Sequence, residues 1–224
     1  MTHQATVFMI DRDEGARETV RQIAEQMHVE SEFYFDAEQF LAAYQPNRSG
    51  CLVSEIRLLG MSGIELQEHL LREYPLLPVI LVTAYAETTF TVRAMRNGAV
   101  TVLDKPISNQ ELWDAVRWAL TQGERSRRIE SKHSELRRRV SYLTEKERRV
   151  LELMAQGKAN KVIARQLNVS IRTVESRRHQ IFRKTKTDSV AELLRLILQT
   201  QTDEAPRPDR WEHPTSEAES LRFL

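Results

Sequence analysis

Five short apolar runs alternate with segments of helical periodicity in the first half of the chain, and this alternation limits the fold most strongly. Strand-length runs that are almost wholly apolar fit a parallel sheet covered by helices on both faces. The intervening segments repeat apolar residues every three or four positions, as an amphipathic helix does. The sequence therefore predicts an α/β domain with a doubly wound, five-stranded parallel sheet. The expected strands are residues 6–10, 31–35, 51–54, 79–83 and 99–103.

Polar side chains stand where several of these strands end. In an open parallel sheet, functional groups gather beyond the carboxyl ends of the strands. We therefore expect one pocket at that edge, formed by the residues at the ends of the first, third, fourth and fifth strands: Asp11, Arg12, Glu55, Thr83 and Lys105.

Charge is distributed unevenly along the chain. Residues 1–122 carry 17 acidic and 10 basic side chains, whereas residues 123–200 carry 20 basic and 9 acidic ones. A basic excess confined to one block indicates a polyanionic partner for that block. Residues 201–224 combine prolines and acids without apolar periodicity, so they are predicted to be a disordered tail.

The remaining composition argues against several other classes of protein. The single cysteine, Cys51, lies in an apolar run and is expected to be a buried structural thiol. Neither a signal peptide nor a membrane-spanning stretch is expected, so we expect a cytoplasmic protein without membrane contact. No cofactor or bound metal is expected either.

Residues 142–200 have the pattern of an all-α, four-helix domain. Thr144 and Glu147 form a predicted capping box, and Gly157 is expected to stop that helix. Ser170 is a predicted N-cap of a strongly basic helix over residues 171–184. A short helix, a tight turn and a basic helix indicate a helix-turn-helix, which predicts double-stranded promoter DNA as the partner.

A linker helix is expected over residues 123–141, with a break or kink at Gly123. Apolar or weakly polar residues recur there at spacings of four and three, as in a short coiled coil. One interpretation is a parallel helix that forms a homodimer, and the other is a solvated linker. The residues of this seam are Ile129, His133, Leu136 and Val140.

The first block, residues 5–122, resembles the receiver domain of bacterial two-component response regulators. The resemblance rests on Asp11, Thr83, Lys105 with Pro106, and the run Met61-Ser62-Gly63. It implies a flavodoxin-like strand order and a phospho-accepting aspartate after the third strand. Four positions depart from that pattern: Glu55 replaces the acceptor, Arg12 the second acid, Val102 the switch aromatic, and Leu58-Leu59-Gly60 the usual proline region.

These departures predict a receiver that has lost phosphorylation. In the family the second acid ligates Mg²⁺, and a guanidinium at that position would repel the ion. We expect Arg12 to pair with Glu55 instead, either as a mimic of the phosphorylated state or as a filling for an empty pocket. Asp13 is expected to cap the first helix rather than to restore the metal site.

The second block closely resembles the LuxR-type DNA-binding domain, through Leu143-Thr144, Glu147, Gly157, Asn160-Lys161, Ile163-Ala164 and Thr173-Val174. The two blocks together resemble NarL/FixJ-type response regulators. The resemblance implies that the third helix of the domain enters the major groove. Expected base-reading residues are Glu175, Ser176 and His179, and expected phosphate contacts are Lys161, Arg172, Thr173, Arg178 and Arg183.

The sequence thus predicts a dimeric, non-enzymatic transcriptional regulator that works independently of phosphorylation, with RNA polymerase as a further candidate partner. Two alternatives remain. One is a conventional phosphorylation switch that uses Glu55 or Asp13 with Mg²⁺, and the other is an adaptor whose receiver half binds a protein.

Overall fold

The computed structural model describes residues 5–46, 48–85 and 87–201 of the 224-residue chain. The expected tail, apart from residue 201, lies outside this part. The contacts divide the chain into two units within helix α5, between Arg127 and Arg128, and each unit is described separately below.

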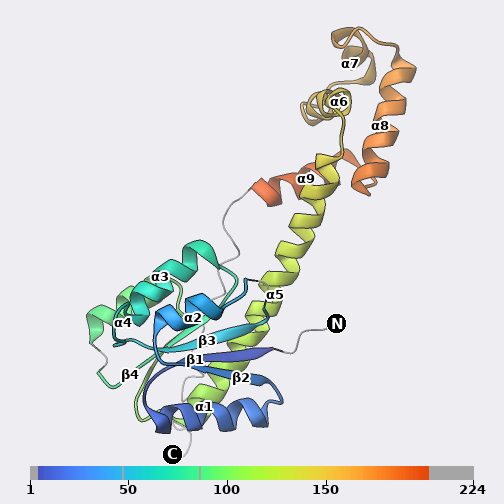
Figure 1. Cartoon of the computed structure of the whole chain (residues 1–224). Coiled ribbons are helices and arrows are strands. Elements are labelled where there is room, and N and C mark those ends of the chain that lie inside the picture. The colour runs from blue at the N-terminus through green and yellow to red at the C-terminus, as the bar shows by residue number, and fades with distance from the viewer. Residues whose placement is uncertain (1–4, 47, 86, 202–224) are drawn as a thin grey trace, which may run out of the picture. The chain divides into compact units, whose positions relative to one another are not determined.

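The first unit contains a five-stranded, wholly parallel sheet in the order β2-β1-β3-β4-β5 (Figure 1). This is the flavodoxin-like order expected from the sequence. The strands fall within three residues of the predicted runs. They are β1 (Thr6–Ile10), β2 (Glu30–Tyr34), β3 (Gly50–Glu55), β4 (Val79–Thr83) and β5 (Val102–Asp104).

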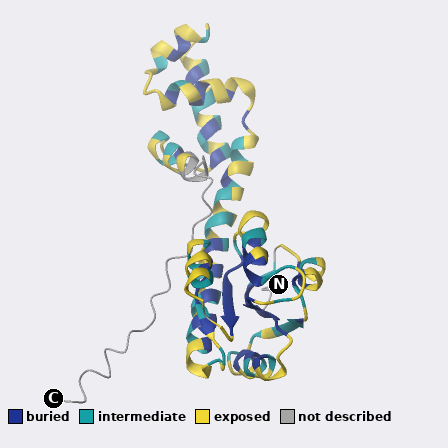
Figure 2. Ribbon diagram, turned by 90° about the vertical axis from the view of Figure 1, so that its left-hand side faces the viewer, coloured by how far each residue is buried: buried dark blue, intermediate teal, exposed yellow. Residues whose placement is uncertain are grey.

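Helices cover both faces of this sheet, and the strand residues alternate between two apolar cores (Figures 1 and 2). On β3, Cys51 and Val53 face the core beneath α1 and α5, whereas Leu52 faces the core beneath α2, α3 and α4. This double covering explains why β1, β3 and β4 are buried along their whole length. The helices are α1 (Glu14–Gln26), α2 (Ala37–Ala43), α3 (Gly63–Glu73), α4 (Thr88–Arg96) and α5 (Asn109–Ser141).

The register of the sheet brings the strand ends together. Ile10 of β1 lies opposite Ser54 of β3, and Glu55 lies opposite Val82 of β4. Thr83 in turn pairs with Asp104 of β5. The residues at and directly after these ends therefore share one edge of the sheet.

Helix α5 is continuous through Gly123, so the expected break at this glycine is wrong. The helix needs a small residue there, because a Cβ atom would lie 3.2 Å from the ring of Pro78 and 3.0 Å from the Arg127 guanidinium. One turn later, Arg127 Nη2 donates to the carbonyl oxygen of Arg48 at 2.7 Å. Close packing against the sheet thus favours glycine without ending the helix.

The second unit is all-α, with one apolar core that includes Val150, Ile163, Val174, Ile181 and Leu193. Three expected helix signals are confirmed. A capping box joins Thr144 and Glu147, Ser170 caps α8, and α6 ends just before Gly157, whose φ is 73°. The helices are α6 (Glu145–Ala155), α7 (Asn160–Gln166), α8 (Ile171–Thr185) and α9 (Val190–Gln201).

Candidate functional sites

Lys105 is the centre of the charged network at the strand ends. Its Nζ lies 2.6 Å from Asp11 Oδ2 and 2.7 Å from Glu55 Oε2, and its side chain is only 14% exposed. Burial alone would lower the pKa of Lys105, but hydrogen bonds and charges from Asp11 and Glu55 outweigh that effect and raise it. One ammonium group therefore bridges two carboxylates and offsets part of their mutual repulsion.

The β1–α1 loop fixes the two aspartates in different roles. The Oδ1 atom of Asp11 accepts from the backbone N–H of Asp13 at 2.9 Å. The carboxylate of Asp13 caps α1 by accepting from the N–H of Ala16 at 3.1 Å. The expectation that Asp13 serves as a helix cap is confirmed.

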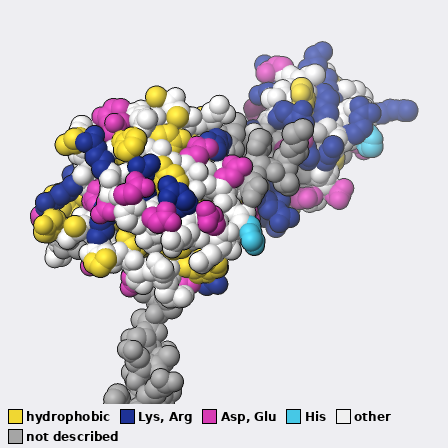
Figure 3. Space-filling model, turned by 60° about the horizontal axis from the view of Figure 1, so that its bottom comes forward, with side chains coloured by type: hydrophobic (Ala, Val, Ile, Leu, Met, Phe, Trp, Pro, Cys, Tyr) yellow, Lys and Arg dark blue, Asp and Glu magenta, His cyan; other side chains and the backbone are white. Residues whose placement is uncertain are grey.

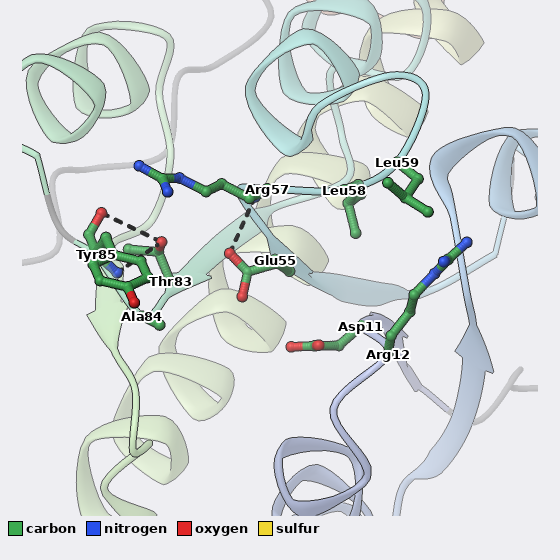
Figure 4. Close-up of a pocket in the computed structure, with 9 residues that line it drawn as sticks. All are labelled: Asp11, Arg12, Glu55, Arg57, Leu58, Leu59, Thr83, Ala84 and Tyr85. Atoms are coloured by element: carbon green, nitrogen blue, oxygen red, sulfur yellow. Dashed lines mark hydrogen bonds between the residues drawn. The ribbon is translucent and has the colours of Figure 1, made fainter.

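Arg12 does not pair with Glu55, so that expectation is wrong. Its Nε donates to the carbonyl oxygen of Phe35 at 3.4 Å, and the side chain extends away from Glu55 (Figure 4). The chain bends at Arg12 directly after β1, and Asp11 points toward the ion network while Arg12 points away from it. Lys105, which comes from the opposite side of the pocket, takes the carboxylate instead.

The loop after β3 contributes residues that the sequence patterns did not single out. Arg57 donates its backbone N–H to Glu55 Oε1 at 3.1 Å, and its guanidinium pairs with Glu87 at 2.7 Å. The same guanidinium lies 5.1 Å from the ring centroid of Tyr85. The sequence signal for this part of the site is an apolar residue, Leu59, in this loop.

Thr83 lies in the pocket as expected, and its hydroxyl is engaged locally. It accepts from the backbone N–H of Tyr85 at 3.2 Å. Val102 packs against the core beneath α2, α3 and α4. A branched aliphatic side chain has no ring or hydroxyl that could rotate toward Thr83.

In the second unit, the exposed side chains of α8 form a continuous stripe. Arg172, Glu175, Ser176, His179 and Arg183 are exposed and recur every three or four residues, so they share one helix face. Val174, Ile181 and Thr185 hold the opposite face in the core. In the face shown in Figure 3, Lys and Arg side chains gather over the second unit, whereas the first unit mixes both signs of charge.

Two other residues expected to contact DNA, Thr173 and Arg178, are less exposed than the residues of this stripe. Thr173 is partly buried, and its hydroxyl lies 2.8 Å from that of Ser170 at the start of α8. Arg178 is also partly buried, with its guanidinium 6.0 Å from the ring of Phe182. Lys161 is exposed on α7. Arg178 is consequently less available for phosphate than Arg172 or Arg183.

Lys184 is committed to holding the end of α8 against the start of α6. Its Nζ lies 2.7 Å from Glu147 Oε2 and 3.2 Å from the carbonyl oxygen of Tyr142. Burial would raise the pKa of Glu147, but Lys184 and the capping contacts with Thr144 outweigh it and lower the pKa. This pair orients the exposed stripe of α8.

We expect Glu147→Gln to lower the free energy of unfolding of the second unit by about 1 kcal/mol at pH 7. Because the pKa of Glu147 is lowered on folding, its contribution is complete above the ordinary value of 4.5 and is lost as the pH falls through the folded value. Urea unfolding followed through NMR signals of α8 should show the two proteins converging as the pH falls below 4.5. An equal difference at all pH values would contradict this assignment.

The four residues of the expected dimer seam on α5 are not equally available. Leu136 is only 5% exposed, and Val140 packs against the core of the second unit. Ile129 and His133 are partly exposed. Half of the seam is thus already used within the chain.

Comparison with known proteins matches both units to protein families. Residues 7–117 match the response regulator receiver domain, and residues 141–197 match the luxR family of bacterial regulatory proteins. The transcriptional regulatory protein FixJ of Azorhizobium caulinodans is 35% identical over 88% of this chain and 94% of its own length. FixJ of Bradyrhizobium diazoefficiens is 31% identical over 88% and 97%.

The chain belongs to the FixJ-type response regulators. A solved structure of the response regulator StyR matches this chain with a TM-score of 0.77 and 37% identity. The match covers 88% of this chain and 99% of the StyR chain. Full-length FixJ from B. japonicum matches with a TM-score of 0.53 and 30% identity, over 89% and 98%.

This membership identifies the chain as a DNA-binding response regulator with a luxR-type helix-turn-helix. It confirms the family expected from the sequence, and α8 is the basic helix of that motif. Within the described residues, no helix is both long and apolar enough to cross a membrane.

Proposed function

We propose that this response regulator binds promoter DNA as a homodimer in the cytoplasm and controls transcription without phosphorylation of its receiver. The observation that carries the proposal is the ion network around Lys105, which joins both pocket carboxylates while Arg12 replaces the second acid of the family. On this proposal, RNA polymerase is the protein that the bound regulator recruits or blocks.

The residues present do not fit the Mg²⁺ site of a phosphorylatable receiver. Mg²⁺ requires oxygen ligands in near-octahedral geometry. Asp11 and Glu55 both face the ammonium of Lys105, and the carboxylate of Asp13 is directed to the N–H of Ala16. At the position where the family has its second acidic ligand, this chain has Arg12, which is a permanent cation. Without the metal, the charge that develops during phosphoryl transfer has no counterion of the usual kind.

The switch that normally follows phosphorylation also lacks its parts. In receivers of this family an aromatic ring moves inward as a threonine turns toward the phosphoryl group. Here the position of the ring is Val102, and the hydroxyl of Thr83 is bonded to the backbone of Tyr85. Glu55 with Lys105 therefore supports a single permanent arrangement of the pocket.

The wild-type protein should take up no phosphoryl group from acetyl phosphate in the presence of Mg²⁺, and its affinity for promoter DNA should not change. Intact-mass spectrometry and a DNA-binding titration measure the two quantities. The matched control is the double variant Arg12→Asp with Glu55→Asp, which restores the acid pair and acceptor of the family and should gain phosphoryl uptake. Phosphorylation of the wild type under the same conditions would overturn the proposal.

A further inference from the structure

An open pocket of about 240 Å³ lies above the ion network at the strand ends (Figure 4). Its floor contains the carboxylates of Asp11 and Glu55, both of which already pair with Lys105. The pocket therefore has space for a ligand although its acidic floor is internally paired. The lining residues are Asp11, Arg12, Glu55, Arg57, Leu58, Leu59, Thr83, Ala84 and Tyr85.

One cation in the lining of this pocket, Arg12, is available to bind an anion. Arg12 and Arg57 lie on opposite sides of Glu55 in the close-up, and both are exposed (Figure 4). Arg57 already pairs with Glu87, and Lys105 pairs with Asp11 and Glu55, whereas Arg12 has no carboxylate within ion-pair distance among the described residues. Among the described residues, Arg12 makes one long hydrogen bond, 3.4 Å to the Phe35 carbonyl oxygen, so its remaining donors can bind a carboxylate ligand.

The walls of the pocket favour an apolar body on that anion. Leu59 is 63% exposed and Tyr85 is 66% exposed, and Leu58 and Ala84 belong to the same lining. Large apolar side chains that are exposed together around a pocket are typical of ligand sites. A cavity of about 150 Å³ accommodates benzene. A pocket of about 240 Å³ therefore suits one ring with an acid group.

We propose that this pocket binds a small organic anion with a single-ring apolar body, whose carboxylate pairs with Arg12 and whose ring covers Leu58, Leu59 and Tyr85. An inorganic oxyanion would leave those apolar walls in water, and a neutral ring would leave Arg12 unused. The inference rests on the proposed loss of phosphorylation, since the ligand takes the place of the phosphoryl signal at the same site.

The pocket is connected to α4, which gives such a ligand a route of influence. The Arg57 guanidinium, which stacks on Tyr85, also pairs with Glu87 at the N-cap of α4. The backbone of Tyr85 is bonded to Thr83 at the end of β4. A ring that packs against Tyr85 therefore acts on the segment that begins α4.

Benzoate is the probe, and the full chain is titrated with it by isothermal calorimetry and by NMR of the β3–α3 and β4–α4 loops. We expect saturable binding with a dissociation constant on the order of 1 mM, and weaker binding of acetate, benzyl alcohol and inorganic phosphate. Arg12→Gln and Leu59→Ser should each weaken benzoate binding by about fivefold or more. Both changes are on exposed side chains, so the fold should be retained.

Arg72→Gln, on the exposed face of α3, is the matched control and should bind benzoate as the wild type does. The proposal is overturned if benzoate binds no better than acetate or phosphate, or if Arg12→Gln and Leu59→Ser leave its affinity unchanged. Uptake of phosphate from acetyl phosphate is a separate measurement. A protein that binds benzoate and is also phosphorylated would refute the proposed function but not the ligand site.

Discussion

Gly63→Ala is expected to lower the free energy of unfolding of the first unit by about 3 kcal/mol. A Cβ atom at this position would lie 2.2 Å from the carbonyl oxygen of Glu55 and 3.1 Å from Cα of Ile56. Both neighbours are backbone atoms, so neither can rotate away as a flexible side chain would. Urea unfolding followed by the fluorescence of Trp113 and Trp118, which pack against the core beneath α1 and α5, measures the loss.

Gly15→Ala provides the control for this substitution. The nearest neighbour of a Cβ there is a side-chain atom, Oδ1 of Asp13 at 3.2 Å, and the site is exposed in the first turn of α1. Its effect should stay within about 1 kcal/mol, because alanine is the better helix former and the cap needs only a small adjustment. Unfolding of both variants at the same urea concentration would contradict the close contact between the start of α3 and the end of β3.

Replacement of Arg172 and Arg183 by Gln should weaken binding to all DNA sequences by a similar factor. Both guanidiniums lie on the exposed stripe of α8, and we assign them to phosphates. The loss of two phosphate contacts should flatten the dependence of log affinity on log salt concentration by about two units. Fluorescence anisotropy over a series of salt concentrations, on specific and random duplexes, measures both effects.

Two substitutions separate charge from sequence reading. Arg149→Gln removes an exposed cation that pairs with Glu145 on α6, and it should leave the salt dependence near that of the wild type. Glu175→Ala should change the preferred sequence, since a carboxylate at the groove selects a cytosine amino group. A uniform loss of affinity in Glu175→Ala would show that Glu175 does not read bases.

The pocket residues could be predicted because the sheet topology follows from local patterns. Apolar strands that alternate with amphipathic helices allow few arrangements, and the carboxyl ends of parallel strands meet at one edge. Position along the chain was therefore enough to bring Asp11, Glu55, Thr83 and Lys105 together. The helix caps of Asp13, Thr144 and Ser170 were predictable for the same reason, since a cap depends on residues within one turn.

Contacts between side chains from distant segments could not be predicted in this way. The sequence predicted Arg12 as the cation that pairs with Glu55, but Lys105 pairs with it in the structure and Arg12 is directed toward Phe35. Leu136 had the spacing of an external seam, yet its side chain is only 5% exposed. The spacing of residues on a helix defines a face but not what covers that face.

The sequence by itself determined the two folds, the order of the strands, the edge at which the charged residues meet and the basic face of α8. Each of these depends on periodicity and on short-range chemistry. Only the tertiary structure decided which charges pair, and it shows that Lys105 pairs with both carboxylates of the pocket. It also decided that Leu59, Tyr85 and the two arginines line the pocket above them. Those features depend on directions of side chains from loops far apart in the chain, which local patterns do not specify.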